Sequence, residues 1–269
     1  MSKLVSIITP LYNSEAYIAK TIESVIAQIY QDWEMIIIDD FSTDKSYDIA
    51  ASYALKEKRI HLIKLPQKSK YGAAEVRNAG IKVAQGAYIA FLDSDDVFLA
   101  DKLTLQVEFM EKNRYFFTYG NYYVYEEKKK NVSKKYIAPA EITYKDLLRH
   151  CYIGCLTAMY DASELGKMYM PEDATKREDF ALWLKILKRT NAYNVGKPLG
   201  IYRVSSKSVS SKKMEMAKHQ YNVIRHLEKI GFFKSLFYMF CWSWLGFFKY
   251  KIRNFGKKKD VSDLNKLIS

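Results

Sequence analysis

Cysteine, proline and glycine are all scarce in this chain of 269 residues, and each scarcity excludes a class of protein. The three cysteines are odd in number and form no CxxC pair, which argues against a disulfide framework or a zinc ribbon and favours a reducing cytosol. Five prolines and eleven glycines are too few for long disordered stretches. The opening MSKLVSIITP has too short an apolar stretch for a signal peptide, so we expect no targeting sequence there.

The C-terminal part also lacks a run long enough to cross a membrane. The uncharged run over residues 235–248 has 14 residues, whereas a membrane-spanning helix needs roughly 20. It is rich in Phe, Trp and Tyr, and residues 212–269 hold thirteen Lys/Arg against four Asp/Glu, which is +9 of the net charge of +13. This pattern predicts a helical tail that lies on an anionic membrane surface. A helix that packs on the rest of the chain, or a dimer interface, is the alternative.

Nucleic acid is a poorer partner for this basic tail. The aromatic residues are packed together and are not interleaved with basic ones, as a set of base-stacking platforms would be. We therefore expect no nucleic-acid partner.

What the chain has in quantity is apolar sequence in short alternating blocks. Hydrophobic residues make up 49% of the chain, enough for a sizeable core. Strand-like and helix-like blocks alternate, which predicts an α/β fold with a mainly parallel sheet flanked by helices. The predicted strands cover residues 4–8, 35–38, 60–65, 87–92 and 115–125. The predicted helices begin at Asn13 or Ser14, cover residues 43–55, 71–84, 102–112 and 180–187, and leave residues 126–135 as a charged loop.

Polar residues follow three of these strands, at residues 9–13, 39–40 and 93–96. In open α/β sheets, ligands bind beyond the carboxyl ends of the strands, so the three clusters predict one site. Asp93 and Asp95 are oxygen ligands suited to a hard divalent cation that also bridges to phosphate. Helix capping is the simpler explanation for Asp95, and Ser42 or Thr43 could cap the next helix in the same way. Capping does not explain why Asp39 and Asp40 are paired.

Three further side chains have an ordinary explanation beside a functional one. Tyr12 could stack on a base, or it could be one more of the 22 tyrosines. Arg77 could reach a diphosphate, or it could be a surface charge. Asp179, just ahead of FALWLKIL, could act as a general base or could cap that helix.

Five segments together resemble family 2 glycosyltransferases, which have the GT-A fold, a Rossmann-like sheet flanked by helices. They are VSIITPLYN, QIYQDWEMIIIDDFSTD, GAAEVRNAGIKVAQGAYIAFLDSDD, REDFALWLKI and YRVSSKSVS, and they occur in the family's order between residues 5 and 210. The resemblance implies a GT-A domain over residues 1–211 and a basic, aromatic tail over residues 212–269.

The resemblance also implies roles for single residues. Pro10, Tyr12 and Asp40 would hold the nucleotide, usually uridine, and Arg77 would lie near base and phosphate. Asp93 would contact the ribose or donor, and Asp95 would ligate Mn²⁺ or Mg²⁺. Asp179 matches the general base of inverting members. The histidine of the family's YRxH pattern is absent, because Ser205 stands in its place.

The resemblance implies transfer of a sugar from a nucleotide-sugar, a UDP-sugar, to a hydroxyl of a glycan or lipid-linked acceptor in bacterial surface-polysaccharide assembly. We expect a cytoplasmic protein, peripheral on the inner face of the membrane. A sugar nucleotidyltransferase is an alternative, although TPLYNSE lacks the glycine-rich basic signature of such enzymes. A non-catalytic nucleotide-sugar-binding protein is another. Neither the donor sugar, the acceptor, the linkage nor the oligomeric state follows from the sequence.

Overall fold

The computed structural model describes residues 3–174, 176–204, 213–249 and 261–268. The predicted boundary at residues 211–212 and Ser205 lie outside these ranges. The first part of the chain alternates strands and helices, as predicted: β1 (Val5–Leu11), α1 (Ile18–Ile26), β2 (Trp33–Asp39), α2 (Ser46–Ala54), β3 (Ile60–Lys64), α3 (Ala73–Val83) and β4 (Tyr88–Phe91).

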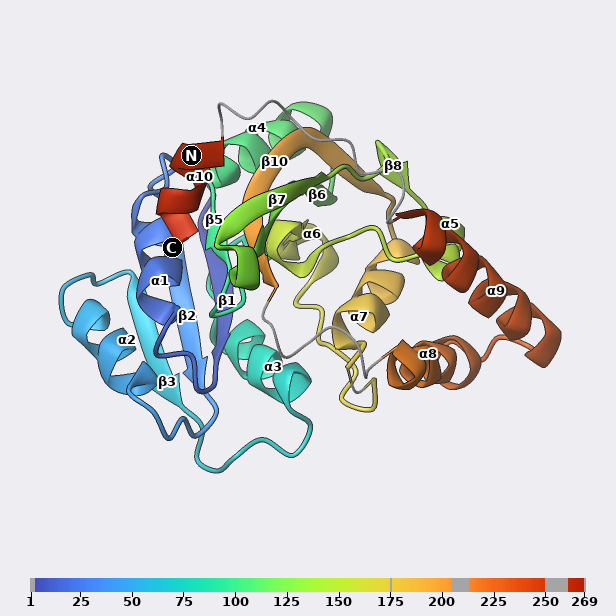
Figure 1. Cartoon of the computed structure of the whole chain (residues 1–269), viewed down its shortest axis with the longest axis horizontal. Coiled ribbons are helices and arrows are strands. Elements are labelled where there is room, and N and C mark those ends of the chain that lie inside the picture. Colours follow the sequence, from blue (N-terminus) through green and yellow to red (C-terminus); the bar gives the residue numbers. More distant parts are fainter. Residues whose placement is uncertain (1–2, 175, 205–212, 250–260, 269) are drawn as a thin grey trace.

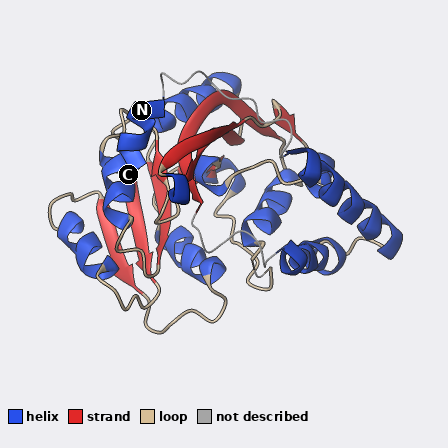
Figure 2. Cartoon of the chain, in the orientation of Figure 1, coloured by secondary structure: helices blue, strands red, loops and turns tan. Residues whose placement is uncertain are grey.

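These four strands form a parallel half-sheet in the order β3-β2-β1-β4 (Figures 1 and 2). Alternate residues of each strand enter two separate cores. Ile8 of β1 and Ile38 of β2 pack in one core with α3, while Ile7 and Ile37 pack in the other with α1. Both faces of the half-sheet are therefore apolar, and this is why its strands are continuous hydrophobic runs.

The rest of the sheet is mixed in direction and continues the order as β4-β9-β6-β10-β5. The α/β prediction with a GT-A sheet is confirmed, with one parallel and one mixed half. The elements are β5 (Val97–Phe98), α4 (Lys102–Asn113), β6 (Phe117–Glu126), η1 (Glu127–Lys129), β7 (Asn131–Tyr136), β8 (Glu141–Ile142), α5 (Tyr144–Arg149), η2 (Cys155–Thr157), β9 (Met159–Asp161), α6 (Ala162–Leu165), α7 (Glu178–Leu187) and β10 (Ala192–Val204).

Three local predictions are wrong. The segment expected to be a charged loop contains β7, which pairs antiparallel with β6 and buries Val132 and Tyr136 beneath its charged residues. Helix α1 begins at Ile18 and α2 at Ser46, each later than predicted. The polar side chains expected to cap these helices join the two loops instead: Ser42 Oγ accepts the Asn13 N–H at 3.1 Å, and Asn13 Oδ1 accepts the Thr43 N–H at 2.8 Å.

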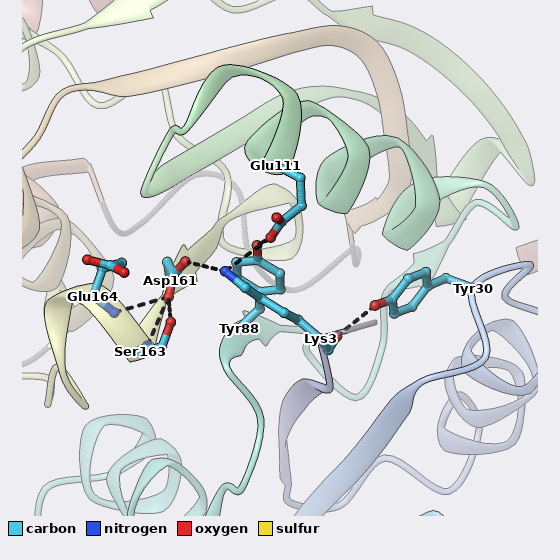
Figure 3. Close-up of polar contacts among 7 residues, drawn as sticks. All are labelled: Lys3, Tyr30, Tyr88, Glu111, Asp161, Ser163 and Glu164. Atoms are coloured by element: carbon cyan, nitrogen blue, oxygen red, sulfur yellow. Dashed lines mark hydrogen bonds and ion pairs between the residues drawn. The ribbon is translucent and has the colours of Figure 1, made fainter. Parts of the chain in front are cut away.

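At the amino ends of the parallel strands, opposite the carboxyl ends where the site is predicted, a polar network joins the segment before β1 to β4, α4 and β9 (Figure 3). Lys3 Nζ lies 3.1 Å from Glu111 and 3.3 Å from Asp161. Tyr88 donates to the same Glu111 carboxylate, and Tyr30 donates to the Lys3 carbonyl at 2.7 Å. This edge is held by polar contacts among its own side chains, whereas the carboxyl edge carries the polar residues predicted to form the site.

The C-terminal part forms α8 (Lys213–Asn222), the π-helical turn η3 (Val223–Leu227), α9 (Phe232–Lys249) and α10 (Val261–Ile268). Helix α9 runs along the right-hand side of the molecule, whereas α10 lies at the upper left beside α1 (Figure 1). One face of α9 packs on the protein through Ser235, Tyr238 and Met239. No helix within the described ranges is long and apolar enough to span a membrane.

Candidate active site

The carboxyl ends of β1, β2 and β4 lie side by side because these strands are parallel and adjacent. Their loops are hydrogen-bonded to each other: Ser14, after β1, shares a 2.8 Å hydroxyl contact with Ser94, after β4. The Thr21 hydroxyl of α1 donates to the carbonyls of Ser94 and Asp96 at 3.0 and 2.8 Å. The sequence clusters at residues 9–13, 39–40 and 93–96 therefore meet at one edge, as predicted.

The first part of this edge presents groups suited to a nucleotide. Pro10 lies in β1 opposite Ile38 of β2. Tyr12 follows β1, is 46% exposed, and accepts a 3.0 Å hydrogen bond from Lys68, whose ammonium lies 4.5 Å over its ring. Asp40, after β2, is buried and accepts two 2.6 Å hydrogen bonds from Ser69. An exposed aromatic face next to a fixed carboxylate offers a stacking surface and an acceptor for a base N–H.

Arg77 forms ion pairs with carboxylates from two separate elements of the predicted site. It is buried on α3 and reaches Asp93 at 2.5 Å and Glu178 of α7 at 3.2 Å. Burial lowers the pKa of its guanidinium, but the fields of Asp93 and Glu178 outweigh this and hold the net pKa above its ordinary value. One cation thus brings the end of β4 to the start of α7, although these segments are far apart in the sequence.

The loop after β4 concentrates negative charge. Burial, and then the neighbouring Asp93, raise the pKa of Asp95 to about 6. Asp96 is 1% exposed and accepts the Arg203 N–H at 2.8 Å, and burial followed by the field of Asp95 raises its pKa well above the ordinary value. Such a loop favours a cation beside it, since a cation offsets both the repulsion and the desolvation of the carboxylates.

This loop fits a divalent metal that is bound together with a substrate. Within the described ranges, no three His, Cys, Asp or Glu side chains are arranged to hold a metal by themselves. Mg²⁺ and similar ions are usually bound by one or two carboxylates together with substrate phosphates, so a complete protein cage is not required. Asp95, with Asp93 beside it, supplies that kind of partial ligand set.

Asp179 and Glu178 open α7 and have different surroundings. Glu178 is bound by Arg77, whereas no Lys or Arg of the described segments forms an ion pair with Asp179. The Asp179 carboxylate accepts the N–H of the next residue, Phe180, at 2.7 Å. It is partly exposed and free of a cation, so its carboxylate can accept a proton from a bound hydroxyl group.

The Cys155 thiol lies within electrostatic reach of these charged groups. Burial raises the pKa of its thiol well above the ordinary value. The Arg77 guanidinium acts to lower that pKa, whereas Asp93, Asp179 and Glu178 raise it further. No local signal marks the place of Cys155, because Arg77, Asp93 and α7 come from other parts of the chain.

The structure thus places the predicted residues in two adjoining groups. The first group contains Tyr12 and Asp40, in the part of this edge that is suited to a nucleotide, together with Lys68 and Ser69. The sequence did not predict Lys68 and Ser69, because their loop has no recognisable motif. The second group contains Arg77, Asp93, Asp95 and Asp179. Ser14 and Ser94 link the two groups.

More than half of the chain matches a known family. Residues 6–163 match the model of Glycosyl transferase family 2. The chain belongs to this family. It is therefore a glycosyltransferase, and the nucleotidyltransferase alternative is set aside.

Relatives across most of the chain carry related names. The chain is 42% identical over 233 residues to the putative teichuronic acid biosynthesis glycosyltransferase TuaG of Bacillus subtilis, covering 86% of this chain and 91% of that protein. It is 41% identical over 223 residues to WfgD of Escherichia coli, covering 82% and 85%. WfgD is named a UDP-Glc:alpha-D-GlcNAc-diphosphoundecaprenol beta-1,3-glucosyltransferase.

Solved structures show the same fold at lower identity. The S. aureus TarS fragment 1–349, crystallised with UDP, matches with a TM-score of 0.63 at 22% identity, over 82% of this chain and 65% of that one. The mannosyltransferase PcManGT of Pyrobaculum calidifontis, crystallised with GDP-Man and Mn²⁺, matches with a TM-score of 0.63 at 16% identity, over 86% and 66%. At these identities the likeness supports the fold and no residue role.

Proposed function

We propose that this glycosyltransferase moves a hexose from a UDP-sugar to a hydroxyl group of a lipid-linked glycan, with inversion at the anomeric carbon and a bound divalent metal. The observation that carries the proposal is the position of Arg77 between Asp93 and Glu178, which sets Asp179 beside the loop of Asp93 and Asp95. The names of WfgD and TuaG support a UDP-sugar donor and a role in the assembly of a surface polysaccharide.

In the proposed reaction, Asp40 and Tyr12 hold the base, and the diphosphate lies toward Asp93 and Asp95. A metal on Asp95 would supply charge stabilisation for the departing diphosphate. Asp179 takes the proton from the acceptor hydroxyl, whose oxygen attacks the anomeric carbon from the face opposite the nucleotide. The bond from that carbon to the diphosphate oxygen breaks, so one displacement inverts the configuration.

Paired variants test the base. Asp179→Asn removes the proton acceptor and is expected to reduce kcat by a factor on the order of 10² or more. Glu178→Gln leaves Asp179 in place and is expected to act mainly through Arg77, with a smaller effect on kcat. Isothermal calorimetry with UDP checks that the donor site survives Asp179→Asn. If Asp179→Asn keeps near-normal kcat while Glu178→Gln loses it, the assignment of the base is wrong.

Metal dependence is tested on the full chain by UDP calorimetry with Mn²⁺ and with a chelator. We expect tight UDP binding to require the metal in the wild type, and Asp95→Asn to remove the difference between the two conditions. Glu164→Gln, a carboxylate variant in α6 away from this edge, is a matched control and should keep the difference. Equal wild-type binding with and without chelator would contradict the metal assignment.

We also propose that α9 lies on the anionic cytoplasmic face of the membrane that carries the acceptor. Its core-facing side is occupied by Ser235, Tyr238 and Met239, while the other side exposes large apolar residues. Phe233 is 84% exposed and Phe240 65%. The remaining exposed members are Phe232, Leu236, Phe237 and Trp244. Residues 212–269 supply the excess of basic groups that attracts anionic headgroups.

Substitution of the exposed face tests this location without disturbing the packed face. The triple variant Phe233→Ser, Phe237→Ser, Phe240→Ser should stay folded, yet lose most co-sedimentation with phosphatidylglycerol vesicles. Wild-type binding should weaken in high salt without vanishing, since ring insertion is not ionic. Leu55→Ser, at an exposed apolar position just after α2, is the matched control and should leave binding unchanged. Full-length protein that ignores the vesicles would refute the membrane proposal.

A further inference from the structure

Arg203, near the end of β10, forms hydrogen bonds with two distant segments of the chain. It is 7% exposed. Its backbone N–H donates to Asp96 Oδ1 at 2.8 Å, and its side-chain Nε donates to the Asp95 carbonyl at 3.0 Å. Its Nη2 donates to the carbonyl of Ile268 in α10 at 2.5 Å. One buried guanidinium therefore joins the Asp95–Asp96 segment to the C-terminal helix.

Two aromatic rings enclose this guanidinium. Its central carbon lies 4.5 Å from the Tyr17 ring centre and 5.1 Å from that of Tyr125. The Tyr17 hydroxyl donates to Glu127 at 2.6 Å, so the ring is itself held in place. A planar guanidinium between two rings, with hydrogen bonds along its edge, has little freedom to move, and lysine cannot reproduce these contacts.

Helix α10 is held on the protein by contacts of its C-terminal half. Ile268 is buried in a small core with Val97, Tyr125, Val132 and Ile201. At the other contact, Asn265 Oδ1 accepts the Val132 N–H at 2.8 Å. The helix lies close to α1 and β7 (Figure 1).

We propose that Arg203 is a positioning residue of the sugar transfer, which uses the seated helix α10 to fix the backbone of Asp95 in the orientation that the donor complex needs. The inference rests on the proposed role of Asp95. Arg203 touches neither substrate nor metal in this scheme, and its effect passes through the Asp95 carbonyl and the Asp96 carboxylate. Helix α10 therefore helps to support the donor site. The position of the Asp95 loop depends on α10 as well as on the packed core.

Variants at both ends of the contact test this inference in the full chain. Arg203→Met removes the two guanidinium hydrogen bonds, to the Asp95 and Ile268 carbonyls, and keeps the backbone bond to Asp96. Arg203→Lys keeps only the charge, and Ile268→Asp unseats α10. Leu267→Asp, at a neighbouring position that is 49% exposed, is the matched control. We expect the first three to weaken Mn²⁺-dependent UDP binding about 10-fold or more in calorimetry, with metal-free UDP binding unchanged. Leu267→Asp should bind as the wild type does.

A second measurement separates positioning from a loss of folding. If α10 and the donor site are coupled, Mn²⁺ with UDP should slow hydrogen exchange of the α10 amides in the wild type, by reciprocity of linkage. That protection should disappear in Arg203→Met, while exchange in β1 and β2 remains native. A merely structural role would accelerate exchange throughout without changing the ratio of metal-dependent to metal-free binding.

The outcomes distinguish this inference from the function on which it rests. Wild-type protein that binds UDP equally with and without Mn²⁺ overturns the metal role of Asp95, and with it this inference. Metal-dependent binding that Arg203→Met and Ile268→Asp leave unchanged overturns the inference alone.

Discussion

Lys102, at the start of α4, is a buried cation that we expect to lower the free energy of unfolding. The side chain is 0% exposed, and Nζ has no hydrogen-bond partner among the described residues. Burial lowers its pKa from 10.5 to about 7. Its one compensating contact is the Phe98 ring, whose centre lies 4.1 Å from Nζ. Lys102→Met keeps the length of the side chain and removes the charge.

The magnitude follows from the displacement of the pKa. Each unit corresponds to about 1.4 kcal/mol, so a fall from 10.5 to about 7 costs roughly 5 kcal/mol when the folded protein is fully protonated. Near pH 7 the folded form is half neutral, and the contact with the ring returns on the order of 1 kcal/mol that methionine loses in part. We therefore expect Lys102→Met to raise the free energy of unfolding by about 3 kcal/mol at pH 7.

The pH dependence provides the sharper check. Between about pH 7 and pH 10.5 the unfolded chain binds a proton that the folded chain has lost, so wild-type stability rises with pH in this window. The difference in unfolding free energy between Lys102→Met and the wild type should be largest below pH 7 and should shrink toward pH 10.5. Urea unfolding at several pH values measures it. Lys112→Met, at an exposed position of the same helix, should change stability by less than about 0.5 kcal/mol.

A gap between Lys102→Met and the wild type that does not vary with pH would refute the reasoning. So would a methionine variant that is less stable than the wild type throughout. Either result would mean that the ammonium has a favourable environment in the folded protein. Because Lys102 lies outside the candidate site, kcat should be unaffected by the substitution.

Three further predictions concern stability and are read by urea unfolding. Gly86→Ala should cost about 2 kcal/mol, because a Cβ would lie 2.6 Å from the Ser6 nitrogen. Gly246→Ala, with no atom within 4 Å, should be neutral or stabilising, and equal costs would contradict the steric argument. Arg77→Met should cost roughly 3 kcal/mol by leaving two carboxylates unpaired, and a native-like variant would show that water replaces the guanidinium. Asp161→Ala should cost about 1–2 kcal/mol through the lost cap of α6 and the lost ion pair with Lys3, and unchanged stability would show that neither contact contributes.

Helix starts are the clearest failure of local pattern in the parallel half of the sheet. Asn13, Ser42 and Thr43 are good capping residues, yet they bond to one another across two loops. Capping preference describes a competition between local partners. Here the parallel strands bring the loops after β1 and β2 together. These side chains therefore hydrogen-bond to partners about 30 residues away and do not cap the helices.

Two features of this protein follow from the sequence itself. Continuous apolar strands separated by amphipathic helices require a sheet covered on both faces, because neither element can bury its apolar side alone. Strand ends that carry Asp40, Asp93 and Asp95 then have to meet at one edge, since parallel strands finish at the same side. Both features depend on neighbouring residues and on the direction of the chain, which the sequence specifies without reference to distant contacts.

Tertiary structure alone decided which charges became partners. Arg77 is bound to Glu178, 101 positions away, whereas Asp179 has no ion-pair partner among the described residues. Arg203 ties the Asp95 loop to Ile268, and Lys102 lies buried without a hydrogen-bond partner within the described ranges. Residue spacing could not predict these pairings, because the strength of an ionic contact depends on distance and burial, and both arise only when separate elements pack together.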